Sequence, residues 1–337
     1  MTRRELCLLP FGALGHPRVA LVTPRLIEVR KIWDQAPHNA FTDLLRFRGY
    51  WYCVFREGTA HVSPDGKLRV IRSRDGRNWD SAALIESPAG DLRDAKLVTT
   101  PGNRLMLCGA VALKQPAAHR HQSLVWFSRD GRDWSDPRPV AEPDFWLWRV
   151  TWYRGAAYGV GYGTNPDRNL RGARVYSSRD GERFETLVAD LGVKYSPSES
   201  AIRFRKDGTA LCLLRRDPYT GPPPIPESAA TGLLGSASPP YTQWTWRDLG
   251  VRIGGPNFIE APGGRLIAAV RLHDQRVRTS LCWLDAASAR LEEFLPLPSG
   301  GDSSYAGLAW HDRRLWVSYY SSHEKKTSIY LATVAID

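Results

Sequence analysis

The sequence predicts an all-β protein, a six-bladed β-propeller of four-stranded antiparallel blades. One heptapeptide recurs three times, as SRDGRNW, SRDGRDW and SRDGERF, at residues 73–79, 128–134 and 178–184. Each copy follows a β-rich run and precedes a polar segment that becomes apolar again, and no sustained helical period is found. Repeats spaced by about 50 residues are typical of propeller blades.

Each heptapeptide is expected to form the turn between the third and fourth strands of a blade. Glycine accepts the positive φ that a tight turn needs, and the aspartate side chain can accept hydrogen bonds from the backbone that follows it. The aspartates and the final aromatic residues are therefore expected to be structural: Asp75, Asp130, Asp180, Trp79, Trp134 and Phe184.

A further strand pair precedes the third strand of each blade. The first three pairs turn at 48–49, 101–103 and 154–155, and the same pattern continues without a clear heptapeptide, turning at 207–208, 263–264 and 312. One propeller domain over residues 1–337 is therefore expected, with blades at about 38–90, 91–143, 144–194, 195–250, 251–299 and 300–337.

Two stretches do not fit the repeat. The N-terminal run RVALVTPRLIEVRKIW contains spare strand sequence, which is expected to complete the last blade and close the ring. The stretch 217–240 is rich in Pro, Gly and Ser, and we expect a long loop between strands two and three of the fourth blade.

The composition narrows the class of protein. The net charge is +11, but the arginines are spread along the whole chain, so an anionic small substrate explains the charge as well as nucleic acid does. No apolar run approaches a membrane span, so we expect no membrane partner. The five dispersed cysteines favour buried free thiols over disulfides or metal ligands. The apolar patch near the start is broken by Pro10, Gly12 and Gly15, so we expect a cytoplasmic protein rather than a secreted one.

The heptapeptide has the pattern Ser-x-Asp-x-Gly-x-x-Trp/Phe, and it resembles the Asp-box of the sialidase (neuraminidase) superfamily. The resemblance covers nearly the whole chain as a fold, and it implies a six-bladed propeller. Such repeats mark the fold rather than an activity, because one propeller architecture carries unrelated functions.

The direction of the strands indicates where a site is expected. Strand one leaves the active face and strand two returns to it, so the turn between strands three and four lies on the far face. The starts of first strands and the ends of second strands therefore border the pocket. Many of the ionisable side chains of the chain gather at these positions, as a substrate site requires.

The resemblance implies roles for four of these positions. Sialidases begin the last blade with a tyrosine nucleophile, matched by Tyr305 in SSYAGL, and the fourth blade with its partner glutamate, matched by Glu199 in SPSESAIRF. Two arginines that bind the substrate carboxylate match Arg215, or its neighbour Arg216, and Arg271. A carboxylate beside the phenol can take its proton, and arginine forks bind carboxylates bidentately.

Blade one departs from the sialidase pattern. It reads AFTDL where sialidases have Phe-Arg-Ile-Pro, so the first arginine of that set is missing. Arg56 in VFREG or Arg93 in LRDAK could bind the same ligand from a neighbouring position.

The acid/base residue is also not evident in the loop after the second strand of blade one. His61 titrates near neutral pH and could serve, with Glu57 orienting it. Asp43 and Asp94, at the starts of first strands, are alternatives, and Asp43 could also bind substrate.

Other pocket-facing residues have simpler expected roles. His323 and Glu324 are expected at the rim, where His323 could contact the ligand. Trp146 and Trp148 could stack on a sugar ring or fill the central channel.

Three functions are consistent with these residues. The first is an exo-glycosidase of sialidase type that releases a terminal acidic 2-keto-acid sugar, either sialic acid or a related ulosonic acid. The second is a glycosidase for neutral sugars that uses the carboxylates Asp43, Asp94 and Glu199. The third is a non-catalytic propeller that binds glycans or proteins. In all three the expected partner is not nucleic acid, and neither a cofactor nor a metal site is indicated.

Overall fold

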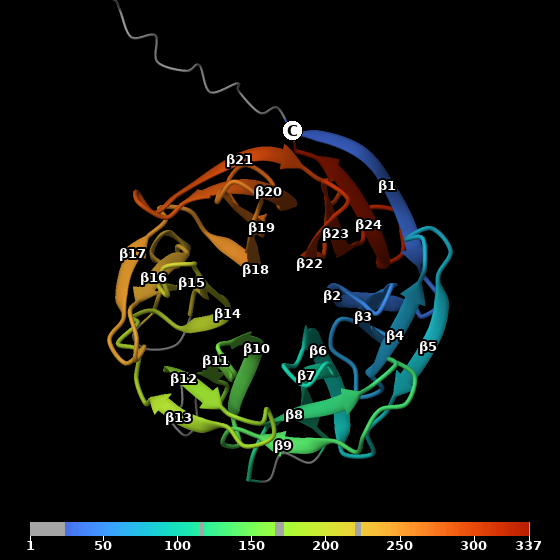
Figure 1. Ribbon diagram of the computed structural model, residues 1–337, viewed down its shortest axis with the longest axis horizontal. Coiled ribbons are helices and arrows are strands. Elements are labelled where there is room, and N and C mark those ends of the chain that lie inside the picture. The colour runs from blue at the N-terminus through green and yellow to red at the C-terminus, as the bar shows by residue number, and fades with distance from the viewer. Residues whose placement is uncertain (1–23, 115–117, 166–171, 220–223, 337) are drawn as a thin grey trace, which may run out of the picture.

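A computed structural model describes residues 24–114, 118–165, 172–219 and 224–336, which form a ring of six blades around a central axis (Figure 1). Each blade is a sheet of four antiparallel strands, so the predicted fold class is confirmed. Within the described residues, helical structure is limited to a single 3-10 turn, η2 (Glu227–Ala229). None of the helices in this part of the chain is long and apolar enough to cross a membrane.

The first strand of each blade lies nearest the centre of the ring, and the later strands follow outward to the rim (Figure 1). Blade one contains β2 (His38–Phe47), β3 (Tyr50–Gly58), β4 (Lys67–Ser73) and β5 (Asp80–Ile85). Blade two contains β6 (Gly90–Thr99), β7 (Leu105–Leu113), β8 (His121–Ser128) and β9 (Arg138–Val140). Blade three contains β10 (Phe145–Tyr153), β11 (Ala156–Gly163), β12 (Ala173–Ser178) and β13 (Glu185–Val188).

The second half of the ring has the same order. Blade four contains β14 (Pro197–Phe204), β15 (Ala210–Arg216), β16 (Leu233–Ala237) and β17 (Thr245–Asp248). Blade five contains β18 (Ile253–Glu260), β19 (Leu266–Leu272), β20 (Arg278–Asp285) and β21 (Arg290–Pro296). Blade six contains β22 (Ser303–His311), β23 (Arg314–Ser321), β24 (Ser328–Ala335) and, at the rim, β1 (Arg25–Trp33).

The sixth blade joins the two halves of the chain that are most distant in sequence. β1 pairs antiparallel with β24, from Arg25 opposite Ala335 to Trp33 opposite Ile329. The spare N-terminal strand therefore completes the last sheet, as expected.

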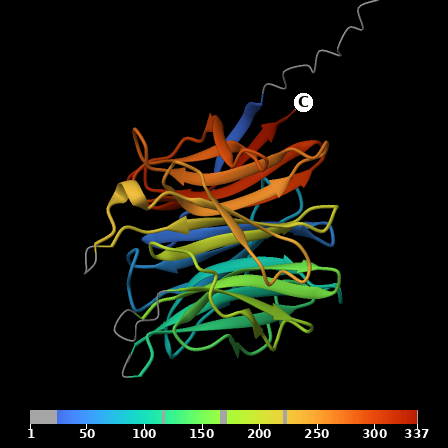
Figure 2. The ribbon, with the colours of Figure 1, turned by 90° about the vertical axis from the view of Figure 1, so that its left-hand side faces the viewer.

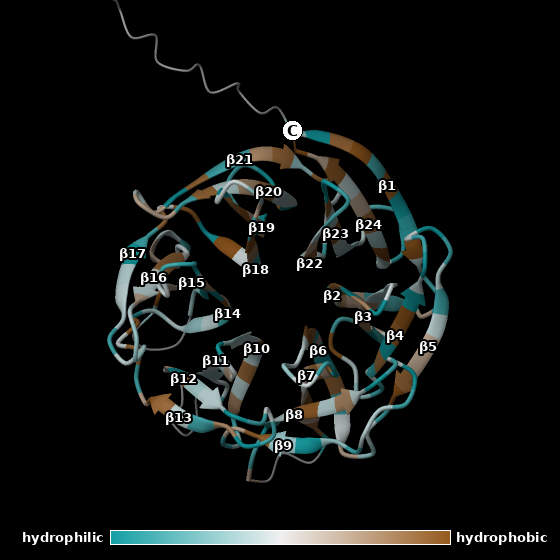
Figure 3. Ribbon diagram, in the orientation of Figure 1, coloured by the Kyte–Doolittle hydropathy of each residue, from teal (hydrophilic) through white to brown (hydrophobic). Residues whose placement is uncertain are grey.

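The hydrophobic core is divided among the interfaces between blades. Each of six buried clusters lies where neighbouring blades pack face to face, because both faces of a blade carry apolar side chains. Figure 3 shows hydrophobic residues on the strands of every blade, while the connecting segments are mostly hydrophilic. Cys53, Cys108, Cys212 and Cys282 are buried and free, as expected, and Cys7 lies outside the described residues.

The three heptapeptides connect the third and fourth strands, and they share one hydrogen-bond pattern. In the first copy, Asp75 Oδ1 accepts hydrogen bonds from the backbone N–H groups of Arg77 at 2.8 Å and Asn78 at 2.9 Å. Gly76 has a φ of 71°, and its N–H donates to Ser73 Oγ at 2.9 Å. The acid therefore fixes a turn, in agreement with a structural role.

One loop expectation needs correction. The stretch 217–240 is not a loop throughout, because β16 lies inside it and pairs with β15 and β17. Residues 220–223 lie outside the described part of the chain.

Candidate functional site

The innermost strand of every blade contains a bulge, and these bulges lie around the centre of the ring. The register between strands one and two shifts at one place in each sheet, after Ala40, Arg93, Leu147, Pro197, Gly254 and Ser304. A bulge bends its strand and redirects a side chain. All strands run from one face of the ring to the other (Figure 2), so these six shifts lie close to the same face.

Tyr305 and Glu199 come from two of these bulges and lie in contact. Tyr305 Oη donates a short hydrogen bond to Glu199 Oε1. The tyrosine adopts φ 51°, in the left-handed region that a bulky residue rarely enters. Such strain costs about 1–3 kcal/mol and is concentrated at functional positions.

Arg215 and the backbone of Gly255 hold the glutamate in place. Arg215 Nη1 donates to Glu199 Oε1 at 2.6 Å and to Tyr305 Oη at 3.2 Å. The N–H of Gly255 donates to Glu199 Oε2 at 2.7 Å. The other side of Arg215 binds Asp217, with Nε 2.8 Å from Oδ1. Glu199 therefore has partners on both oxygens.

The charges of this group fix its protonation. Burial raises the pKa of Tyr305, and the negative charge of Glu199 raises it further against the opposing effect of Arg215. Burial acts to raise the pKa of Glu199, but the Arg215 and Arg271 charges outweigh it and hold that pKa below its usual value. At neutral pH the pair is a neutral phenol that donates to an ionised carboxylate.

Two more arginines face the same tyrosine. The guanidinium carbon of Arg271 lies 5.4 Å from the centre of the Tyr305 ring, and its buried Nε has no hydrogen-bond partner. Arg93 lies over the Phe41 ring at 5.1 Å, and that ring is 5.2 Å from the ring of Tyr305. A buried arginine with an unpaired donor favours an anionic ligand.

Asp94 and Lys96 lie beside this group on the first strand of blade two. Asp94 is 5% exposed, and its Oδ2 is 3.7 Å from Arg93 Nε. Burial raises the pKa of Asp94 against the charges of Arg93 and Lys96. Lys96 Nζ lies 5.1 Å from the Trp148 ring and 5.8 Å from the Tyr305 ring.

Aromatic rings form one wall of the site. The ring centres of Trp148 and Tyr305 are 5.7 Å apart. Trp146 stacks on Tyr162 with an angle of 3° between the ring planes. Trp146 and Trp148 are both buried, so they fill the wall rather than stand free in the channel.

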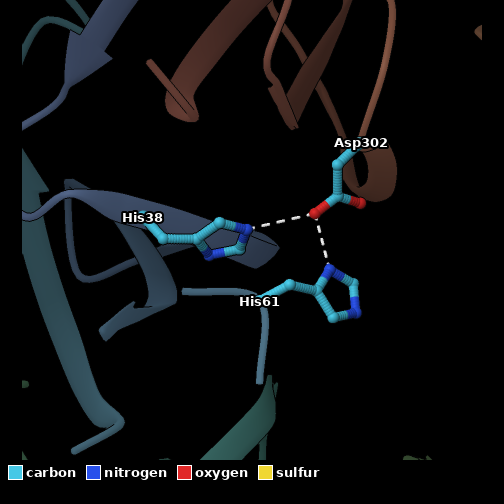
Figure 4. A group of neighbouring side chains, drawn as sticks. All are labelled: His38, His61 and Asp302. Carbon is cyan, nitrogen blue, oxygen red and sulfur yellow. Dashed lines mark hydrogen bonds and ion pairs between the residues drawn. The ribbon is translucent and has the colours of Figure 1, made fainter. Parts of the chain in front are cut away.

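His61 lies at the mouth of this site with an unexpected partner (Figure 4). Its Nδ1 is 2.6 Å from Asp302 Oδ2, and His38 Nε2 is 3.1 Å from the same oxygen. Tyr320 Oη donates to the other oxygen of Asp302 at 2.6 Å. Burial acts to raise the pKa of Asp302, but the hydrogen bonds from His38, His61 and Tyr320 outweigh it and hold that pKa far below its usual range.

The expectation that Glu57 orients His61 is wrong. Glu57 accepts hydrogen bonds from Trp33 Nε1 at 2.7 Å and from Arg69 Nη2 at 3.0 Å. The carboxylate therefore binds β1 to blade one and is directed away from the histidine.

The expectation that Arg56 or Asp43 takes part in the site is also wrong, because their polar atoms form buried hydrogen bonds within the protein. Arg56 is 0% exposed, and its guanidinium donates to Asp91 at 2.7 Å and to the loop carbonyls of Ala60 and Ser63. Asp43 Oδ2 accepts from Arg149 Nη1 and from the N–H of Leu97, each at 2.8 Å. Neither can contact a substrate in the pocket.

His323 and Arg216 lie away from the tyrosine. His323 Nδ1 is 2.9 Å from Ser321 Oγ, and its ring packs on Tyr330 at 5.0 Å. Arg216 binds the carbonyl of Thr231 at 2.6 Å and the carboxylate of Asp248 at 2.5 Å. Of the two neighbouring arginines, Arg215 is therefore the one at the site.

Some residues of the site were not singled out from the sequence: Lys96, Tyr162, Asp302, Tyr320 and His38. Asp302 and Lys96 lie in the segments DSSYAG and DLRDAK, which border the pocket by strand direction. Their place in these segments could have indicated that Asp302 and Lys96 belong to the site. Their charge alone did not distinguish them from the charged residues next to them.

The comparison with solved structures identifies the fold of this chain, whereas the sequence comparisons assign it to no family. No family model matches the chain, and no curated protein matches its sequence. A solved protein of unknown function from Dyadobacter fermentans superposes with a TM-score of 0.79 at 18% identity, over 93% of this chain and 99% of that chain. An α-L-arabinanase of Penicillium chrysogenum in complex with arabinobiose superposes with a TM-score of 0.69 at 12% identity, over 92% and 98%.

A sialidase of Trypanosoma rangeli in complex with sialic acid is a further structural relative. It superposes with a TM-score of 0.63 at 12% identity, over 92% of this chain and 58% of the sialidase chain. The protein thus has the six-bladed propeller fold of sialidases and arabinanases.

Proposed function

We propose that the protein is an exo-glycosidase of sialidase type, which hydrolyses a terminal acidic 2-keto-acid sugar such as sialic acid or a related ulosonic acid. The observation that carries the proposal is the hydrogen bond from Tyr305 to the ionised Glu199, beside the incompletely paired Arg271. The glycosidases among the structural relatives support a carbohydrate substrate.

In this proposal the arginines bind the sugar carboxylate. Arg271 has an unpaired Nε, and Arg93 already donates from Nη1 to the carbonyl of His61 and to Asp91, so Arg271 is the main donor for the carboxylate. Arg215 chiefly positions Glu199 and Tyr305. A neutral nucleophile suits such a substrate, because a carboxylate nucleophile would be repelled by the carboxylate of the sugar.

The reaction then proceeds in two steps. Tyr305 Oη attacks the anomeric carbon and transfers its proton to Glu199, while the bond to the leaving oxygen breaks and Asp94 protonates that oxygen. Water next attacks the same carbon as Asp94 takes its proton, and Tyr305 leaves and recovers its proton from Glu199. Asp94 suits the role of acid because its raised pKa favours the protonated form.

The test is hydrolysis of a panel of aryl ketosides of sialic and related ulosonic acids, with an aryl α-L-arabinofuranoside as the neutral comparison. We expect Tyr305→Phe to lower kcat on the order of 10³-fold or more. The matched control is Tyr52→Phe, since Tyr52 is equally buried but donates to Asp130 on the far face. Full activity of Tyr305→Phe would remove the nucleophile assignment.

The remaining alternatives give different results. Hydrolysis of the furanoside that survives Arg271→Ala would favour a neutral-sugar glycosidase. Thermal stabilisation by free acidic sugars with no turnover of any substrate would favour a binding propeller.

A further inference from the structure

We infer that His38, His61 and Asp302 form a site for one divalent transition-metal ion of the zinc class at the mouth of the propeller. The inference concerns a different group of residues from the Tyr305–Glu199 pair and does not rest on the proposed hydrolysis.

The donor atoms already converge (Figure 4). His38 Nε2 and His61 Nδ1 point to the same carboxylate oxygen, Asp302 Oδ2, at 3.1 Å and 2.6 Å, and the three candidate donor atoms lie within 4.8 Å of one another. An ion that takes the place of the proton shared in each contact can reach all three atoms, since metal bonds to such ligands are about 2.0–2.2 Å long.

The kinds of ligand select the class of ion. Two imidazole nitrogens and one carboxylate oxygen suit zinc and neighbouring transition metals, whereas calcium and magnesium prefer all-oxygen sites. The side chain of His61 is 48% exposed, so a further coordination position is open on the solvent side. Three protein ligands and an open position is the composition of a site that can accept water or another ligand.

The surroundings hold the carboxylate in position. Tyr320 Oη donates to Asp302 Oδ1 at 2.6 Å, which leaves Oδ2 directed at the histidines. Such outer hydrogen bonds orient ligating groups in metal sites. Arg271 Nη1 lies 3.8 Å from Oδ1 and weakens cation binding, so we expect an affinity below that of a closed structural zinc site.

The site would connect two blades at the opening of the channel. His38 begins β2 of blade one, His61 lies in the loop after β3, and Asp302 precedes β22 of blade six. The buried Arg56 already holds this loop by donating hydrogen bonds to the carbonyls of Ala60 and Ser63. A bound ion would hold the same loop through the exposed side chain of His61 as well.

The test uses the full chain without an affinity tag, stripped with a chelator and then titrated with Zn²⁺ by calorimetry in the absence of any sugar. We expect binding of one ion per chain, a melting temperature raised by several degrees at saturating Zn²⁺, and visible absorption bands of Co²⁺ in a site of low coordination number. Ca²⁺ and Mg²⁺ are expected to give none of these effects.

The variants decide where the ion binds. His61→Ala removes an exposed side chain without emptying the core, and it should abolish the bound ion and the shift in melting temperature. Asp302→Asn should weaken binding at least tenfold. The matched control is His311→Ala, a histidine on the opposite turn of blade six that pairs with Asp312.

Absence of saturable binding to the wild-type chain would overturn the inference, as would equal binding to wild type and His61→Ala. Because binding is read without substrate, either result leaves the proposed hydrolysis to be judged on its own test.

Discussion

Lys96 is unusual because its ammonium group is buried beside the candidate site. The residue is 3% exposed, and Nζ has the carbonyl of Ala95 at 3.3 Å as a hydrogen-bond partner. Burial lowers the pKa of Lys96 to about 8, against the opposing charge of Asp94. The protonated form is therefore held in the folded protein at a cost in stability, as expected where a charge has a role.

We expect Lys96→Met to be about 1–3 kcal/mol more stable than wild type at pH 7, because the substitution removes a buried charge. The ordinary pKa of lysine lies above the folded value, so between pH 8 and 10.5 the unfolded chain binds more protons, and wild-type stability rises with pH in that window. The difference between the two proteins should therefore shrink as pH rises from 8 towards 10.5.

Urea denaturation at several pH values measures this difference. Lys114→Met, at an exposed lysine, serves as the control and should show no such trend. If the difference in free energy of unfolding between wild type and Lys96→Met stays constant from pH 7 to pH 10, the burial of the Lys96 charge does not cost stability as we infer.

The sequence identified most of the candidate site, and the errors have a physical reason. Tyr305, Glu199, Arg215, Arg271, Arg93 and Asp94 were all expected to border the pocket, and the structure brings them together. The choice between Arg56 and Arg93 depended on which way each side chain points, and a bulge changes the alternation that would decide it. The partner of His61 could not be found from local sequence, because Asp302 is 241 residues away.

At the scale of the element, the close approach of β18 to β22 positions the nucleophile candidate. Gly255 has a φ of 54°, and a Cβ at this position would lie 2.9 Å from the backbone N and 3.1 Å from the Cα of Tyr305. The glycine therefore serves a close backbone contact as well as a left-handed turn.

We expect Gly255→Ala to displace Tyr305 and lower kcat/KM on the proposed substrate by about 10²-fold, the usual effect of a misplacement near 1 Å. Gly263→Ala is the matched control, because Gly263 has a φ of 89° but open space around its Cβ position. Both variants should lose about 1–2 kcal/mol of stability through backbone strain. Equal activity of the two variants, measured beside their melting temperatures, would show that the contact does not position Tyr305.

The turns were more predictable than the bulges. Gly49, Gly155 and Gly208 all adopt positive φ at turns that the sequence marked. The left-handed backbone of Tyr305 and Asp94 carries no such signal, because the preference of these residue types is overridden by packing against neighbouring blades.

At the scale of the whole molecule, the ring depends on the pairing of β1 with β24. Without β1, β24 would present an unpaired strand edge at the rim, and such edges promote aggregation. The β1 strand also covers the cluster between blades five and six, against which Leu26 and Val29 pack.

We expect the double substitution Val29→Pro with Arg30→Pro to destabilise the protein by about 2 kcal/mol or more and to cause self-association. Neighbouring residues point their N–H groups in opposite directions, so one of the two prolines must remove a bond to β24. The control, Val29→Ala with Arg30→Ala, shortens the same side chains and keeps the backbone donors. Urea denaturation and light scattering measure both effects, and equal stability of the two double variants would exclude a role for the ladder.

The six-bladed ring was accessible from sequence because the period of the repeat gave the register of the first three blades. The last three blades lack the heptapeptide, and their strand pairs were found from turn residues at matching spacing. The position of β16 inside the Pro-rich stretch was missed, since LLGSA has few strand-forming residues and is stabilised by β15 and β17 on either side.

The six bulges also bear on how such a ring can acquire new chemistry. Each blade presents one irregular position at the channel, and the residues there differ as widely as Phe41, Asp94, Trp148, Gly255 and Tyr305. Phe41, Trp148 and Tyr305 also belong to one buried cluster, so a change of side chain at any of these three must preserve packing as well as chemistry. Substrate selectivity can therefore change at one bulge at a time, and most freely at a position outside this cluster, such as Asp94.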